Sequence, residues 1–561
     1  MKWHLHLIAI ATVTFFFTSC KDSNTQGRYI PASASLAVHI NGKTLSEKLP
    51  WSEIKANPLF ENVYADSSVS ASVKKILDNP DNSGMDSKAD VIFFMQRDAE
   101  GGYIAVQGSV KDDAVLKTLA TEIIKNGTAS EKDGINYISN SRQCFGWNKE
   151  KFILVADVPE LDALSKRMMQ DSIDISGSKK RDVAATCKAV FDLDESKSLA
   201  KDEKFGKLVK ENGDLHFWIN TEEMNKNSSA SGMMAMVNLE KLYKGSFTTG
   251  TVNFDNGKIN VSMKSYAGEE LKKLHEKFSG GKVSSDMLKK IPGKDILGAV
   301  ALNFKPEGLK EFLKILNLDG AVNIATAKMK FTLDDFVKAN KGDIVIGVSD
   351  FAMATDTMEG IEIPKPDFNF VFAGSIGDKE SFNKLVNAGK NLSGSMAKED
   401  GSLPFAFSSN AGYFALSNTQ ANADQYINGS GIDFDFISKI SGEPMGGYFN
   451  IQSILKAVGP QASKDSLAKV VYDASLKIWD NIIFKGGEFK DGAMLSTAEI
   501  NLVDKNTNSL KQLNAYLNVI SQVIKEKDKK QKEDMMALED ALQNSNLGDV
   551  PATIPEEAKK K

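Results

Sequence analysis

Four apolar segments that each contain an asparagine constrain the fold more than any other feature of this sequence. They occupy residues 38–43, 217–221, 300–304 and 448–451, with the asparagines at Asn41, Asn220, Asn303 and Asn450. In the first segment, apolar Val38 and Ile40 alternate with His39, which is the period of a strand that buries one face. Asparagine is a favoured helix N-cap because its side-chain oxygen accepts from a free N–H of the first turn. Each segment therefore predicts a strand that passes directly into a helix.

The order of motifs around these segments occurs twice along the chain. One series starts at Ile30-Pro31 and a second at Ile291-Pro292. The other matched stretches are residues 90–93 with 343–346, 105–110 with 371–376, 151–156 with 412–417, and the turn Asn256-Gly257 with Asp491-Gly492. Asn-Gly and Asp-Gly supply the positive φ angles of a two-residue hairpin turn. The sequence therefore predicts an α+β fold made of two divergent copies of one unit, residues 29–283 and 284–524. Each copy is expected to be a mainly antiparallel sheet with helices packed on one face.

Residues 1–20 have the pattern of a bacterial lipoprotein signal peptide. A basic start at Lys2 is followed by an apolar run over residues 5–17 and then by Thr18-Ser19-Cys20. Such a start, an apolar run and small residues before a cleavage point are typical of a secretory signal, and the run is too short for a good membrane-spanning helix. Thr18-Ser19-Cys20 resembles the lipobox, in which the cysteine becomes the diacylated N-terminus. An ordinary signal peptide with a chance cysteine is the alternative.

Lipidation of Cys20 would make the membrane a partner of the mature chain. More than one acyl chain, palmitate among them, is needed for lasting attachment, and a lipobox cysteine receives both diacyl and N-acyl chains. The polar residues 21–28 are then expected to be a tether. We expect an outer-membrane lipoprotein, and the sequence leaves open whether it faces the periplasm or the cell surface.

The composition is that of a soluble globular body. The chain has 561 residues, of which 42% are hydrophobic and 25% charged, with a net charge of −5. This length suits roughly two to four domains, and the lack of a basic stripe argues against nucleic acid as a partner. Residues 525–561 begin with a dense charge run and end in prolines and lysines. We expect a charged helix with a disordered end there.

The histidines do not predict a catalytic or metal site. The mature chain would keep His39, His216 and His275, and a histidine catalyst or multi-histidine metal site needs two or three of these to converge. His39 matches Ala301 in the second series, so the shared fold does not need an imidazole there. The sequence also lacks the GxSxG, HExxH and Walker motifs. We therefore expect structural or surface roles for the histidines, with His275 on a polar helix surface, and we expect no catalytic residues and no cofactor.

The best candidate for a ligand site is a calcium-loop pattern over residues 79–90. Oxygen-bearing side chains stand at positions one, three, five and twelve of that pattern: Asn79, Asp81, Ser83 and Asp90. The aspartate at position twelve replaces the usual bidentate glutamate, and a strand is expected to follow in place of a helix. The alternative is a helix-to-strand turn in which Gly84 takes a left-handed conformation.

Two cysteines would remain after lipidation. Cys144 and Cys187 stand outside any CxxC motif or ligand cluster. They either form a disulfide in an oxidising compartment or are buried thiols, and the sequence leaves both alternatives open.

Three stretches together resemble one known family. They are Thr18-Ser19-Cys20, the opening residues 29–51 and residues 79–86. They are similar to a domain-of-unknown-function family of Bacteroidetes cell-envelope lipoproteins, and the resemblance extends over nearly the whole mature chain. It implies a cell-envelope lipoprotein and supplies no activity or site residues.

Two classes of function follow from the sequence. The first is a non-catalytic scaffold or binding module of the cell envelope, with an envelope protein as a partner. The internal duplication, the predicted anchor and the lack of converging polar chemistry favour it. The second is a surface glycan-binding or hydrolytic accessory protein, which would need exposed aromatic platforms or paired carboxylates in a cleft.

Overall fold

The computed structural model describes residues 26–58, 60, 64, 69–86, 89–98, 100–158, 181–226, 237–358, 361–394, 405–462 and 465–544. The predicted signal peptide, Cys20 and residues 21–25 of the predicted tether lie outside the described residues, as do residues 545–561 of the predicted tail. Among the helices that the structure describes, none is long and apolar enough to span a membrane.

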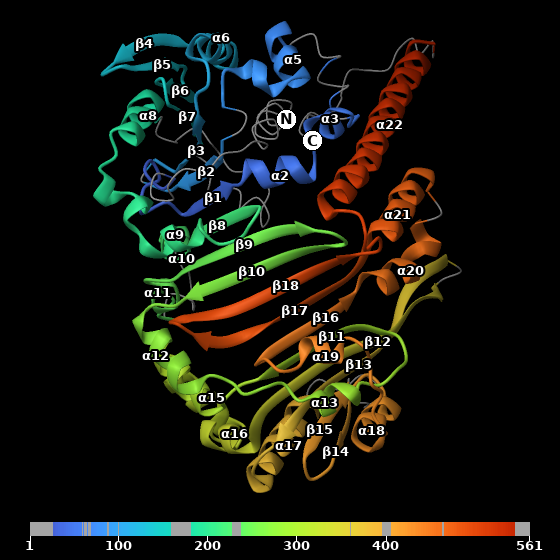
Figure 1. Ribbon diagram of the computed structural model, residues 1–561. Helices are drawn as coiled ribbons and strands as arrows, with labels where there is room; N and C mark the ends of the chain where they lie inside the picture. The colour runs from blue at the N-terminus through green and yellow to red at the C-terminus, as the bar shows by residue number, and fades with distance from the viewer. Residues whose placement is uncertain are drawn as a thin grey trace, which may run out of the picture.

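One antiparallel sheet of 18 strands runs through the described chain (Figure 1). In spatial order its strands are β4 (Thr128–Lys132), β5 (Ile135–Ser139), β6 (Gln143–Trp147), β7 (Lys151–Asp157), β3 (Tyr103–Ser109), β2 (Val91–Gln96), β1 (Leu36–Ile40), β8 (Leu215–Asn220), β9 (Phe247–Asp255), β10 (Lys258–Tyr266), β18 (Ala493–Leu502), β17 (Trp479–Lys490), β16 (Met445–Asn450), β11 (Ile296–Asn303), β12 (Asn340–Met358), β13 (Ile361–Ile376), β15 (Tyr413–Ser417) and β14 (Ala406–Ser409). The expected mixture of helices with a mainly antiparallel sheet is confirmed.

The strand order reads alike in both directions from the middle of the sheet. Strand β10 pairs with β18, and Figure 1 shows the β9–β10 and β17–β18 hairpins side by side at the centre of the molecule. One side continues as β9, β8, β1, β2, β3 and β7, and the other as β17, β16, β11, β12, β13 and β15. At the junction Ser262 pairs with Thr497. These two residues are as far apart in the sequence as the turn glycines Gly257 and Gly492.

Three of the four predicted strand-to-helix joints have the predicted cap. Asn41 Oδ1 accepts from Thr44 N–H at the start of α2 (Gly42–Lys48). Asn220 caps α10 (Thr221–Asn225) in the same way. Asn450 Oδ1 accepts from Ser453 N–H at the start of α20 (Ile451–Ala462). These bonds satisfy backbone donors that the first helical turn leaves free.

The cap predicted at Asn303 is wrong. Helix α14 (Glu307–Ile315) begins only after Pro306, which has no side-chain cap bond. Proline suits a helix start because its ring presets φ and it has no N–H to satisfy. The amide of Asn303 instead donates to Asp343 Oδ1 at 2.6 Å and accepts from the N–H of Gly281 at 2.5 Å.

Helices cover both faces of the sheet in the first half, so the predicted one-sided packing is wrong there. Strand β7 is buried from Phe152 to Ala156, and its side chains alternate between two cores. Ile153 and Val155 pack toward α8 (Val183–Phe191) and α9 (Glu203–Leu208). On the opposite face, the core around Phe152 and Leu154 includes residues of α5 (Ala71–Asp78) and α6 (Asp113–Ile123). A strand that is apolar throughout is typical of a sheet with both faces covered.

The second half has a core cluster built from one sheet face and three short helices. These helices are α13 (Ser285–Lys289), α18 (Gln420–Asn428) and α19 (Ile437–Ile440). Small residues of β11, β12, β13 and β15 form the sheet side of this cluster. The remaining elements include α3 (Trp51–Lys55), η1 (Pro80–Ser83), η2 (Glu195–Lys197), η3 (Leu199–Lys201), α11 (Glu240–Tyr243), α12 (Glu269–Phe278), α15 (Asp319–Lys328), α16 (Leu333–Ala339), α17 (Lys379–Gly394) and α21 (Ser466–Ile478).

The charged segment predicted from residue 525 is the outer part of a longer helix. Helix α22 (Ser509–Asn544) begins well before it and projects from the body at the upper right of Figure 1. Its base is fixed to the first half, because Lys511 Nζ lies 2.6 Å from Glu53 Oε1.

Candidate functional site

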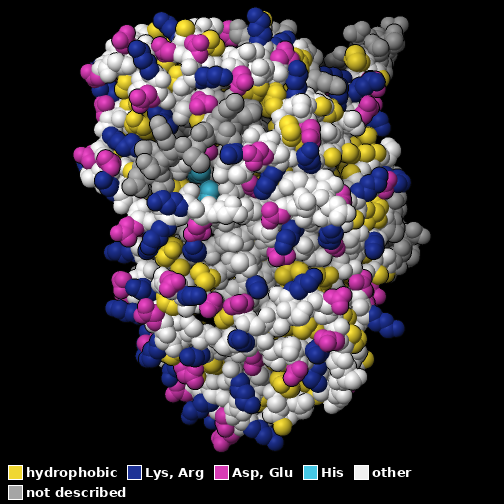
Figure 2. Space-filling view, in the orientation of Figure 1, with side chains coloured by type: hydrophobic (Ala, Val, Ile, Leu, Met, Phe, Trp, Pro, Cys, Tyr) yellow, Lys and Arg dark blue, Asp and Glu magenta, His cyan; other side chains and the backbone are white. Residues whose placement is uncertain are grey.

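A row of polar side chains crosses the core of the first half. The register pairs His216 with His39, His39 with Ile92, and Ile92 with Gln107, so all four side chains share one face of the sheet. His39, His216 and Gln107 are only 3%, 2% and 5% exposed, respectively. Apolar core residues, Ala37 and Ile153 among them, lie on the same face. In Figure 2 histidine colour is visible over the β1 and β8 region.

The two imidazoles link a carboxylate to a backbone carbonyl. His39 Nε2 lies 3.0 Å from Asp90 Oδ2, and His39 Nδ1 lies 3.0 Å from His216 Nδ1. His216 Nε2 lies 2.9 Å from the carbonyl oxygen of Glu211. All three separations are hydrogen-bond distances. The sequence did not predict that these histidines meet, yet His39 and His216 are in contact although 177 residues separate them.

Local structure positions each end of this chain of contacts. Asp90 directly precedes β2, and its carboxylate also accepts from Gln26 Nε2 at 2.9 Å. Gln107 Nε2 reaches the backbone carbonyl of Gln26 at 3.4 Å. The side-chain oxygen of Gln26 is buried without a hydrogen-bond partner in the described structure. The cluster therefore ties the first described residue of the chain to the sheet.

A lysine borders the same cluster. Lys151 Nζ donates to Ser109 Oγ at 3.1 Å across the β3–β7 pair. Burial lowers the pKa of Lys151, and the nearby carboxylates of Asp90, Glu150 and Asp86 oppose this shift.

The second half has small apolar residues at the same places in the strand pairing. Ala301 pairs with Gly446 across β11 and β16, and Ala301 also pairs with Val345 of β12. Tyr426 of α18 is fully buried in this core and donates to the carbonyl of Met287 at 3.0 Å. The match of His39 to Ala301 was visible in the sequence. The match of His216 to Gly446 could have been found, because each stands four residues before its joint asparagine.

The third histidine is elsewhere. His275 lies on α12 and its ring stacks against Phe489, with centroids 6.0 Å apart. Burial lowers the pKa of His275. The predicted polar-surface position is therefore wrong in detail, since the ring is half-buried against an aromatic neighbour.

The calcium candidates take part in separate contacts. Asn79 Oδ1 accepts from the N–H of Asp81, and Ser83 Oγ accepts from the N–H of Met85, each at 3.1 Å. Asp90 belongs to the histidine cluster. Gly84 has a φ of 76°, as the alternative turn requires. No group of three or more His, Cys, Asp or Glu side chains gathers as metal ligands among the described residues, and calcium binding stays a prediction.

Cys144 and Cys187 are fully buried free thiols in one core. The hydrogen bond with the Cys144 thiol and, second, burial raise the pKa of the Cys187 thiol. The Cys187 thiol also lies 3.7 Å from the carbonyl oxygen of Ile153. The structure thus has the buried-thiol alternative, and a disulfide stays a prediction for oxidising conditions.

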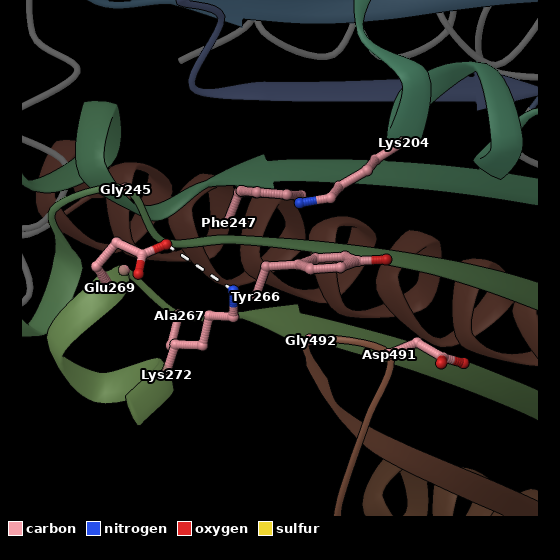
Figure 3. Close-up of a pocket in the computed structure, with 10 residues that line it drawn as sticks. Lys204, Gly245, Phe247, Tyr266, Ala267, Glu269, Lys272, Asp491 and Gly492 are labelled. Carbon is pink, nitrogen blue, oxygen red and sulfur yellow. Dashed lines mark ion pairs between the residues drawn. The ribbon is translucent and has the colours of Figure 1, made fainter. Parts of the chain in front are cut away.

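A cavity of about 380 Å³ lies where the β9–β10 hairpin meets the β17–β18 turn (Figure 3). Its lining residues are Lys204, Gly245, Phe247, Tyr266, Ala267, Gly268, Glu269, Lys272, Asp491 and Gly492. The rings of Phe247 and Tyr266 stack with centroids 4.5 Å apart. Lys204 Nζ lies 4.3 Å from the Tyr266 centroid, and Figure 3 shows its side chain reaching over that ring. The cavity therefore offers aromatic surface beside an ammonium group.

Comparisons with known proteins give a family match and distant structural similarity. Residues 27–401 match the model of a family described as "Domain of unknown function (DUF4836)". A search of curated proteins found no significant match. Solved structures with similarity include crystal form IV of TP0453, at 11% identity and a TM-score of 0.24, covering 44% of this chain and 81% of that chain. Crystal form III of TP0453 has the same identity and TM-score and covers 45% and 81%.

Proposed function

The chain belongs to the DUF4836 family, and we propose that it is a lipid-anchored cell-envelope protein that binds a ligand or an envelope partner without catalysing a reaction. The observation that carries the binding proposal is the cavity beside the central hairpins. Aromatic surface with a few placed polar groups is typical of small-ligand sites.

The chemistry of the cavity suggests the kind of ligand. The Lys204 ammonium lies beside the Phe247 and Tyr266 rings, and within the described chain no carboxylate forms an ion pair with it. Lys272 Nζ lies 3.9 Å from Glu269 Oε1, so these two charges form an ion pair with each other. Such a site suits a ligand that brings an anionic group to Lys204 and an apolar or ring face to Tyr266.

A titration with an anionic aromatic compound and a neutral oligosaccharide tests this proposal. Isothermal calorimetry of the full chain would use phenyl phosphate as the acidic probe and maltotriose as the neutral one. We expect the acidic probe to bind and Lys204→Ala to weaken it at least tenfold. Lys207→Ala, on the same helix and outside the cavity lining, is the matched control. Equal binding by Lys204→Ala and the parent would overturn this site, and preferential binding of maltotriose would favour the glycan-binding class.

The aromatic pair does not by itself make a glycan platform. Phe247 and Tyr266 stack on each other at an interplanar angle of 15°, so they do not lie side by side in one plane. The glycan-binding accessory protein therefore stays the alternative function, decided by the neutral probe.

The membrane attachment is supported by the sequence of residues 1–20. Metabolic labelling with an alkyne analogue of palmitate is expected to mark the native protein and not the Cys20→Ser variant. Fractionation is expected to place the labelled protein in the outer membrane, and protease treatment of intact cells distinguishes the periplasmic from the surface orientation. Labelling of Cys20→Ser at the parent's level would remove the proposed anchor.

We propose further that residues 29–283 and 284–524 are two copies of one unit. The strand order that reads alike from β10 and β18 supports this, as does the pairing of Ser262 with Thr497 at the junction. Fragments ending at 283 and beginning at 284 would be co-expressed to test it. We expect them to associate through the β10–β18 edge, and failure of both fragments to fold or associate would count against two units.

A further inference from the structure

We infer that His39, His216 and Asp90 form a buried proton-binding site, which holds one proton more than two neutral imidazoles would carry. The site belongs to the first half alone, because Ala301 and Gly446 occupy the paired positions in the second half.

The number of hydrogens follows from the contacts. The chain of contacts ends at the Glu211 carbonyl on one side and at the Asp90 carboxylate on the other, and both groups are acceptors. Each of the three short contacts needs one hydrogen between its heavy atoms. Two neutral imidazoles supply two hydrogens in total. The complete set therefore holds a third one, whether Asp90 or His39 carries the hydrogen between them.

The surroundings favour a position for the added proton next to Asp90. Gln26 also donates to Asp90 Oδ2, which stabilises the carboxylate form. Burial lowers the pKa of His216, and His39 beside it adds to this. The added proton accordingly lies on His39, where an ion pair with Asp90 offsets the cost of burying a charge.

Other charged groups near the site are few. Lys151 of β7 lies near enough to Asp90 for that carboxylate to oppose the lowering of the Lys151 pKa. Glu211 lies beyond His216, and its carboxylate accepts a hydrogen bond from Lys264. On the neighbouring strand β9, the buried residue Thr251 pairs with His216. In the described structure Asp90 is the one charged side chain in hydrogen-bond contact with either imidazole.

The site resists proton loss and proton gain alike. In an unfolded chain, an ordinary histidine has a pKa near 6.5. Below pH about 6 each imidazole then carries two ring N–H hydrogens, which makes four for His39 and His216 with Asp90 ionised. Above pH about 7 each imidazole carries one, which makes two. The folded site carries three across this range. Asp90 also accepts from the side chain of Gln26, six residues after the predicted lipidation site Cys20.

Nitrogen-15 NMR of the full chain in detergent tests the inference directly. Histidine is labelled with nitrogen-15, and long-range correlations at pH 7.5 report whether each ring nitrogen is protonated. His4→Gln and His6→Gln remove the two imidazoles near the start of the full chain. His275→Gln assigns the remaining third imidazole and serves as the matched control, since it leaves the pair intact. We expect one doubly protonated imidazole and one neutral Nε2–H imidazole, and Asp90→Asn should lose the added proton. Two neutral imidazoles in the parent protein, together with an ionised Asp90 carboxyl in its carbon-13 shift, would overturn the inference, even if Asp90→Asn fails to fold.

Discussion

His39 and His216 face each other across β1 and β8, whereas Ala301 and Gly446 face each other across β11 and β16. The surrounding strands pair in the same order. The first position forms hydrogen bonds in the first-half core, whereas at the second position Ala301 belongs to an apolar core and Ile440 packs over Gly446. Strand pairing is therefore compatible with either chemistry at this place.

This difference separates what the fold needs from what the first half adds. Buried polar groups cost free energy unless each is hydrogen-bonded, and small apolar residues avoid that cost. In the second half, β11 and β16 pair in the same arrangement without imidazoles. The histidine pair therefore reflects a property of the first half beyond packing, which we assign to proton binding.

The largest expected effect comes from a substitution in the second-half core, which contains Tyr426. Tyr426 is fully buried, so Tyr426→Ala removes a ring from a closed core and leaves a cavity. We expect a loss of about 3–5 kcal/mol in the free energy of unfolding, measured by urea denaturation. A loss below about 1 kcal/mol would show that this core is not closed as described.

Gly446→Ala tests whether the second half has room for any side chain at the position of His216. A Cβ atom at Gly446 would lie 2.0 Å from the backbone oxygen of Ile440. We expect destabilisation of about 1–3 kcal/mol from this overpacking. Gly320→Ala is the matched control because a Cβ atom there meets nothing within 4 Å. It should be neutral or stabilise α15 by up to about 1 kcal/mol.

Asp90→Asn and Asp343→Asn compare the carboxylate that directly precedes β2 with the carboxylate near the start of β12. Asp90 binds His39 and Gln26, whereas Asp343 accepts from the amide of Asn303. We expect Asp90→Asn to cost about 2 kcal/mol at pH 7, because it removes the charged partner of a buried hydrogen bond. Asp343→Asn should cost about 1 kcal/mol or less. Equal urea midpoints for the two variants would contradict the special role of Asp90.

The smallest expected effect concerns the joints. Asn41→Ala removes a cap bond from α2 and should cost about 1 kcal/mol. Val115→Ala, a change at a partly exposed apolar position of α6, gives the background for a surface truncation. Identical thermal midpoints for both variants would mean that the cap contributes nothing measurable.

The joints and hairpins could be predicted because their signals are local. Alternation at residues 36–41 indicated β1, and the Asn-Gly and Asp-Gly turns indicated the two central hairpins, which the structure confirms. Pro306 carried the signal that the helix begins beside it and not at Asn303, because proline is favoured at helix starts. The continuous apolar run in β7 likewise carried the signal for helices on both faces.

The histidine cluster could not be predicted in the same way. Its members come from β1, from the residue before β2 and from β8, and only the pairing of distant strands brings them together. The cavity has the same origin, because the turn at Asp491 reaches the first-half residues Lys204 and Tyr266 through the β10–β18 junction. Periodicity indicates which face a residue occupies, and it does not indicate which strand lies beside it.

The pH dependence of unfolding tests the proton site most directly. The free energy of unfolding would be measured by urea denaturation from pH 5 to pH 8 for the parent and for the double variant His39→Gln, His216→Gln. Because the pKa of His216 is lowered in the folded protein, the unfolded chain binds more protons below about pH 6.5, and the free energy of unfolding decreases as pH falls. Because the folded site keeps the added proton, the folded protein binds more protons above about pH 6.5, and the free energy of unfolding decreases as pH rises. We predict a difference profile with a maximum near pH 6.5 and slopes approaching about 1.4 kcal/mol per pH unit on each side. A profile that is flat, or that rises steadily with pH, would contradict an added proton on His39 beside Asp90.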